Sequence, residues 1–173
     1  MYSIYVFNMY SNILSFIDYC NSAYGGLTEK NIFKLQKLQN NAVRFIFRLH
    51  GKKKHDAIMP YLKKLHFLPV RYRIQFKVAL LVFKCLNDLA PGYLTNMLST
   101  RDIKRRSSRL DDDFYLLKTL PAPRFTRTEA AFSYYGPKVW NVLPYSIRCI
   151  TNIEQFKKCL KSYYFNIAFE GIQ

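Results

Sequence analysis

Polar residues, all but one of them lysine or arginine, recur every three or four residues between positions 29 and 49, and their cations could bind phosphate groups. On an α-helix this spacing puts the side chains within about 80° of one another on one face. No acidic residue from 30 to 55 supplies the i, i+4 partner that a merely solvated face normally uses. A solvated face and a phosphate-binding face both remain possible, and the missing partners strengthen the second interpretation. This basic stripe consists of Lys30, Lys34, Lys37, Asn41, Arg44 and Arg48.

The formal net charge of the 173 residues is +16, and most of it lies in one quarter of the chain. Between positions 34 and 77 twelve residues are basic and one, Asp56, is acidic. Such an excess is typical of proteins that bind polyanions, so we expect RNA or DNA as the partner, bound through phosphate. On charge alone, an anionic membrane or a complex that neutralises the charge is the alternative, and we expect no membrane partner. The further candidates for phosphate contact are Lys52, Lys53, Lys54, Lys63, Arg71, Arg73, Arg105 and Arg106.

Aromatic residues near the basic stripe could stack on unpaired bases and so add selectivity. The nearest are Phe45, Phe47 and Tyr72. For each of the three, burial in the core is the preferred interpretation.

The acidic run Asp111 to Asp113 is the one cluster of carboxylates in the chain. Polymerases hold two metal ions with aspartates, but they place them on hairpins between apolar strands. Here the run follows a loop rich in Arg and Ser, which favours an exposed acidic turn. No Gly-rich phosphate loop, nucleophile elbow or HExxH helix occurs either. We therefore expect no enzymatic activity and no cofactor.

The cysteines and histidines do not suggest a metal site. Cys20, Cys85, Cys149 and Cys159 lack the short gaps of a zinc knuckle, and no histidine lies near them. We interpret the four as reduced, mostly buried thiols. The first residues lack a basic region and a clear cleavage site, so we expect an intracellular location, nuclear or cytoplasmic.

The fold class expected is mainly α, a helical domain around one central apolar helix at about 70–89. Pro69 suits the helix start, and Pro91 with Gly92 stops it. Apolar residues occupy most of its circumference, whereas Lys77 and Lys84 interrupt the run too early for a membrane span.

The other elements should pack around that helix. A helix from Glu29 to about 49 should bury the face Leu35, Leu38, Ala42, Ile46 and Leu49, and a shorter one near Pro60 should bury Leu62 and Leu65. A last helix, opened by a capping box at 151–154, should bury Ile153, Phe156, Leu160, Tyr164 and Ile167.

Between these helices the pattern is weaker. Residues 114–120 with 124–127 allow a short β-hairpin near 114–127. A helix at 128–135 should break at Gly136-Pro137, and Trp140 should anchor a second small core. We thus expect a helical region with a basic face at 1–98, an exposed basic and acidic loop at 99–113, and a smaller C-terminal lobe at 114–173.

An ordered set of short motifs extends over most of the chain. It comprises DYCN at 18–21, LQKLQNNAVR at 35–44, LHFLPV at 65–70, RIQFK at 73–77, PGYL at 91–94, RSS at 106–108 and GPKVWNVLP at 136–144. In content and order the set resembles the region that follows the polymerase domain in LINE-type, jockey-like non-LTR retrotransposon reverse transcriptases.

The resemblance implies a non-catalytic RNA- or DNA-binding tail fragment, because the palm's YxDD box and the endonuclease of the parent RNA-directed DNA polymerase are missing from this sequence. It also implies the missing polymerase domains as a partner. The alternative is an inert or adopted helical protein-interaction module without nucleic-acid binding.

Overall fold

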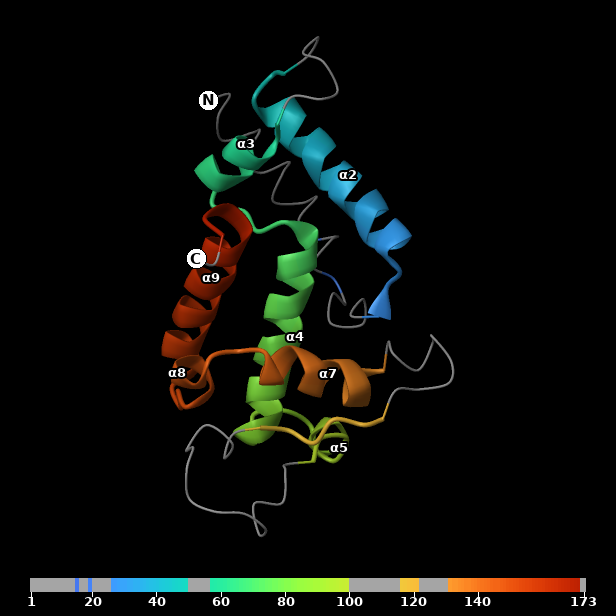
Figure 1. Ribbon diagram of the computed structural model, residues 1–173, viewed down its shortest axis with the longest axis vertical. Coiled ribbons are helices and arrows are strands. Elements are labelled where there is room, and N and C mark those ends of the chain that lie inside the picture. The colour runs from blue at the N-terminus through green and yellow to red at the C-terminus, as the bar shows by residue number, and fades with distance from the viewer. Residues whose placement is uncertain are drawn as a thin grey trace.

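The computed structural model describes residues 15, 19, 26–49, 57–99, 116–121 and 131–171. The described residues form seven helices and no sheet, so the expected mainly α fold is confirmed. Figure 1 shows these helices grouped around one that runs through the middle of the molecule.

The central helix is α4 (Val70–Leu86). It contacts α2 (Glu29–Ile46), α5 (Gly92–Thr95), α7 (Phe132–Asn141) and α9 (Ile153–Phe169). Its inward side chains, from Val70 to Cys85, are almost completely buried. The predicted central helix is therefore confirmed.

The main core lies where α4, α7 and α9 meet. Phe83 stacks on Phe156 with 4.2 Å between ring centroids, and Trp140 lies 5.8 Å from the same Phe156 ring. All three side chains are at most 1% exposed, so each contributes the full hydrophobic free energy of a large aromatic group. Trp140 belongs to this cluster, and the prediction that it anchors a second small core is wrong.

A second, smaller apolar cluster joins α2 to α3 (Met59–Lys64). Leu62 is 1% exposed, Leu65 is half-buried, and Lys63 and Lys64 point outward, as predicted for the short helix near Pro60. The buried members of the cluster are Ala42, Val43, Leu49, Ile58 and Leu62.

Helix α7 continues through Gly136 and Pro137, so the predicted break at these residues is wrong. Pro137 is the sixth residue of the helix, where its missing N–H costs a single hydrogen bond. Gly136 is buried against α4, and a Cβ atom there would lie 3.2 Å from Val82 Cγ2 and from Phe132 Cε2. Gly136 therefore allows α7 and α4 to pack closely.

The segment 116–121 forms no strand, so the prediction of a hairpin strand there is wrong. The second predicted strand, at 124–127, lies outside the described residues. Leu117 instead inserts into the main core at 1% exposure. The Asn141 side chain holds its backbone in place: Leu117 N–H donates to Asn141 Oδ1 and Asn141 Nδ2 donates to Leu117 O, each over 2.9 Å. These two hydrogen bonds satisfy both backbone polar groups of Leu117.

Helices α2 and α4 end three residues before the predicted positions. In both cases a non-glycine residue takes the left-handed conformation, Arg48 at φ 49° and Asp88 at φ 55°. The next N–H then donates back into the helix, from Leu49 to Arg44 O over 2.9 Å and from Leu89 to Lys84 O over 2.8 Å. This Schellman geometry usually has glycine at the left-handed position, so neither Arg48 nor Asp88 marks the end of its helix in the sequence.

The last helix, α9, follows the short α8 (Tyr145–Arg148). Its N-cap is Asn152, whose Oδ1 accepts from Glu154 and Gln155 N–H over 2.9 and 3.1 Å, so the capping box expected from Thr151 is corrected by one residue. Its predicted buried stripe is confirmed, with Ile153 and Ile167 partly buried and Phe156, Leu160 and Tyr164 buried.

Candidate nucleic-acid interface

The buried face of α2 fixes which of its side chains reach the solvent. Gln39, Ala42 and Val43 are buried, and Leu35 packs at the edge of the main core. Leu38, predicted to be buried, is 55% exposed, so the buried face lies to one side of the predicted one.

A network of side-chain amides holds this face of α2 on the start of α4. Gln39 Nε2 donates to Leu68 O over 3.0 Å, and Val70 N–H donates to Gln36 Oε1 over 2.9 Å. Gln36 Nε2 in turn donates to Gln39 Oε1 and Asn40 Oδ1, over 2.8 and 2.9 Å. Val70 is the first residue of α4, where a backbone N–H has no partner inside the helix. The network therefore caps α4 and orients α2 at the same time.

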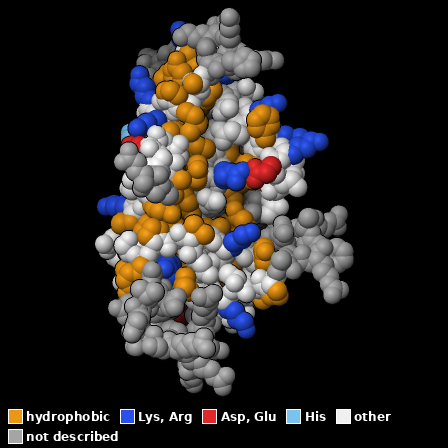
Figure 2. Space-filling view, in the orientation of Figure 1, with side chains coloured by type: hydrophobic (Ala, Val, Ile, Leu, Met, Phe, Trp, Pro, Cys, Tyr) orange, Lys and Arg blue, Asp and Glu red, His pale blue; other side chains and the backbone are white. Residues whose placement is uncertain are grey.

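The basic stripe lies on the opposite side of α2 and faces outward. Lys30, Lys34, Lys37 and Arg48 are exposed, and Arg44 is half-buried. None of the three lysines forms an ion pair with a described residue. Figure 2 shows Lys and Arg side chains along the α2 edge of the molecule, beside hydrophobic ones. The predicted separation of buried and basic faces is thus present in the structure.

Two other predicted site residues form ion pairs. Arg71 pairs with Glu29 at the start of α2, and Lys63 Nζ lies 3.3 Å from Glu170 Oε1 at the end of α9. Both pairs are largely exposed and therefore weak, so a phosphate could displace either carboxylate. Arg73, on α4, is half-buried and already engaged in an interaction.

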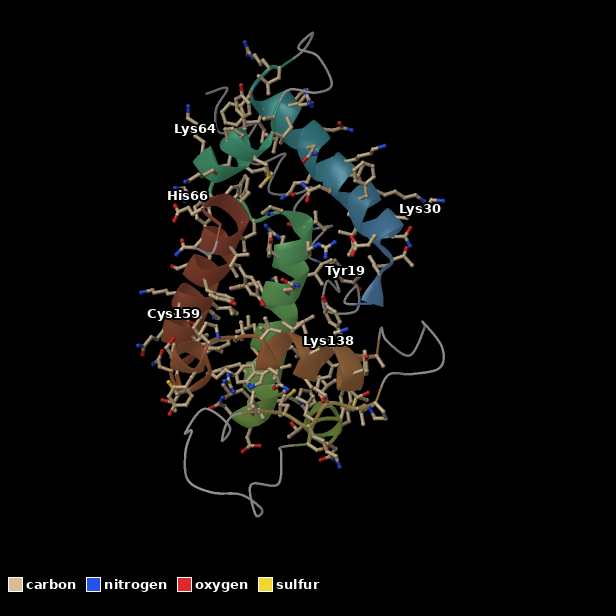
Figure 3. All side chains as sticks on the ribbon, viewed as in Figure 1. Tyr19, Lys30, Lys64, His66, Lys138 and Cys159 are labelled. Atoms are coloured by element: carbon tan, nitrogen blue, oxygen red, sulfur yellow. The ribbon has the colours of Figure 1, made fainter. Side chains whose placement is uncertain are left out.

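The described cations do not form a single surface. In Figure 3 Lys30 and Lys64 are labelled on opposite sides of the molecule, over α2 and α3. Lys64 Nζ lies 5.8 Å from the centroid of the Phe47 ring. Lys52, Lys53, Lys54, Arg105 and Arg106 lie outside the described residues, and their role stays a prediction.

Exposed apolar side chains flank the basic stripe. Phe33 is 60% exposed. Phe45 is 47% exposed, so the burial expected for it is wrong, whereas Phe47 and Tyr72 pack against the two apolar clusters as expected. The ammonium of Lys37 lies 4.8 Å from the centroid of the Phe33 ring. Sequence reasoning missed Phe33, although its position three residues after Lys30 and four before Lys37 puts it beside both.

An open groove of about 570 Å³ lies between the first turn of α2 and helices α4, α7 and α9. Burial raises the pKa values of Tyr135, Tyr163 and Tyr164 further above neutral pH, where a tyrosine hydroxyl is already protonated. These hydroxyls can donate hydrogen bonds but cannot act as bases there. Figure 2 shows a band of hydrophobic side chains running down the same face.

Within the described ranges, no cluster of three or more His, Cys, Asp or Glu side chains could hold a metal ion. The three described cysteines, Cys85, Cys149 and Cys159, are free thiols, and only the first is fully buried. No helix in the described part of the chain is long and apolar enough to cross a bilayer. No protein-family model, curated protein or solved structure matches this chain.

Proposed function

We propose that this chain is a non-catalytic nucleic-acid-binding region that contacts phosphates through the basic stripe of α2. The observation that carries the proposal is the outward position of Lys30, Lys34 and Lys37, which have no carboxylate partner among the described residues. A helix held rigidly by its buried face presents these cations at fixed spacing, which suits a regularly charged backbone. Phosphate contacts position a protein without reading bases, so little sequence preference is expected.

Salt dependence tests this proposal, because each phosphate contact releases counterions. Five contacts from the stripe to a single strand give a slope of log K against log salt of about −3.5. We expect Lys34→Gln/Lys37→Gln to flatten that slope by about 1.4, since two contacts are lost. A fluorescence titration of the purified chain with a labelled RNA strand at several salt concentrations measures both values.

The matched control is Lys158→Gln/Lys161→Gln. These two lysines are exposed on α9, on the other side of α4 from α2 in Figure 1, and the variant loses the same net charge. Its slope should equal that of the wild type. Equal slopes in all three proteins would contradict the stripe as the contact surface.

The family proposed for the chain is the post-polymerase region of a LINE-type, jockey-like non-LTR reverse transcriptase, and the sequence motifs alone support it. The missing polymerase domains are then a second proposed partner. With Mg²⁺ or Mn²⁺ present, the purified chain should not extend a primer on RNA. Template-dependent incorporation that is lost in Asp112→Ala/Asp113→Ala would overturn the non-catalytic proposal.

An inert or adopted protein-interaction module is the second candidate. Exposed apolar side chains at the α5 end of the molecule favour it, with Leu89 57%, Tyr93 66% and Met97 47% exposed. Nucleic-acid binding separates the two candidates, because the module would bind RNA no better than the stripe variant does.

A further inference from the structure

Phe33 combines three properties that its neighbours on α2 do not share. Its ring is 60% exposed, it lies between Lys30 and Lys37 on the helix surface, and it lines an open hollow of about 560 Å³. Asn40 and Arg44 line the same hollow from the following turns of α2. An aromatic face, an amide and a guanidinium therefore border one space beside the basic stripe.

The chemistry of this space matches a nucleobase. Aromatic rings stack on bases of every type, and amide and guanidinium groups hydrogen-bond to the edges of bases. A base within a duplex is stacked on both faces and cannot reach an aromatic side chain on a convex helix. An unpaired base can do so, while its own phosphates stay near the lysines.

The ring of Phe33 is at present covered in part by the Lys37 ammonium, 4.8 Å from its centroid. At exposed sites a cation–π contact is worth about a two- to fivefold preference, whereas base stacking on an aromatic ring is worth about five- to 150-fold. A base should therefore displace the ammonium. Lys37 is then free to contact the adjacent phosphate. Displacement of the ammonium by the base therefore allows both the stacking contact and the phosphate contact.

We propose that the hollow beside Phe33 receives one unpaired base of a single-stranded nucleic acid, stacked on the Phe33 ring, with its flanking phosphates on the basic stripe. This inference rests on the proposed function and names its substrate class as single strands in preference to duplexes. Stacking on the Phe33 ring accepts any base, so the affinity should depend on strandedness more than on base identity.

The test compares a labelled uridine-only RNA strand with an RNA duplex of equal length, titrated with the full chain. Phe33→Leu keeps the bulk and removes the π face, and should weaken strand binding by about fivefold or more. Its affinity for the duplex and its salt slope should not change, because no phosphate contact is removed. Phe33→Tyr should bind the strand like the wild type.

Leu38→Ala is the matched control, because Leu38 is 55% exposed on the other flank of the stripe and does not line the hollow. It should bind both probes like the wild type. Equal losses in Phe33→Leu and Leu38→Ala, or equal losses on strand and duplex, would overturn the stacking proposal and leave the proposed function standing.

Failure of the proposed function has a different signature, namely no salt-sensitive binding of either probe by the wild type. A vesicle of anionic phospholipid is the third probe. Phe33-dependent binding to vesicles without binding to the strand would overturn the inference in favour of a membrane surface.

Discussion

The Gln39 side chain is fully buried and connects α2 to the start of α4 through the Leu68 carbonyl. A glutamine in a helix is normally on the solvent side, whereas the sequence predicts Leu38 on the buried face. The hydrogen bond to a residue 29 positions away offsets the cost of burying the amide, and no local pattern reveals it. With Gln39 on the buried face, the neighbouring Leu38 lies to one side of it and is exposed.

Replacing Gln39 by Leu should therefore destabilise the protein although it adds an apolar side chain to the core. Leu68 O would lose its donor, and an unsatisfied buried carbonyl costs about 1–3 kcal/mol. Urea unfolding measures the loss. The control Asn41→Leu changes an exposed residue of the same helix and should shift the free energy of unfolding by less than about 0.5 kcal/mol. Equal stability of both variants would mean that the Gln39 amide is not needed.

At the scale of helices, periodicity predicted the interiors well and the ends poorly. The buried positions of α9 follow a regular spacing, and the apolar circumference of α4 identified the central helix, because hydrophobic burial acts on every turn. Helix ends depend on one or two residues. Arg48, His66 and Asp88 end α2, α3 and α4 in the left-handed conformation, which sequence reasoning reserves for glycine.

Substituting Asp88 by Gly should stabilise the protein, because it removes the steric cost of a Cβ at φ 55°. We expect a gain of about 0.5–1 kcal/mol in the free energy of unfolding, reduced by the greater freedom of glycine in the unfolded chain. Asp88→Val should destabilise it, since a β-branched side chain tolerates this conformation poorly. Thermal unfolding of the wild type and both variants measures their order of stability. The opposite order would contradict the Schellman geometry at this helix end.

At the scale of the whole molecule, the sequence could predict the helical class and the outward basic stripe, since both follow from spacing along single helices. It could not predict which residues belong to the main core and which to the smaller apolar cluster. Trp140 packs in the main core with residues of α4 and α9 because α7 continues without a break at Gly136 and lies close to α4. That close approach depends on the absence of a Cβ atom at Gly136. The ion pairs of Arg71 and Lys63, to residues 42 and 107 positions away, are likewise products of tertiary structure.

The tyrosines packed between α4, α7 and α9, of which Tyr164 is buried and Tyr135 and Tyr163 are partly buried, should make the fold sensitive to alkaline pH. Tyr164 is 4% exposed, and burial together with the neighbouring Tyr163 and Tyr135 raises its pKa far above the usual value of about 10. Below that pH the group is protonated in both states and its stabilising contribution is complete. As the pH rises above about 10, the unfolded chain loses this proton while the native state retains it, so stability falls by about 1.4 kcal/mol per pH unit for this one group.

Tyr164→Phe removes the titrating hydroxyl and keeps the ring in the core, so its free energy of unfolding should fall less steeply with pH above 10 than that of the wild type. The difference between the two slopes should correspond to one proton, while Tyr135 and Tyr163 still contribute to both, because burial raises their pKa values as well. Urea unfolding at a series of pH values from neutral to alkaline provides the measurement. Tyr93→Phe, which removes a hydroxyl from a ring that is 66% exposed, is the control for the substitution itself. Identical slopes for wild type and Tyr164→Phe would show that this hydroxyl ionises equally well in the native protein, and hence that the interface of α9 with α4 admits water.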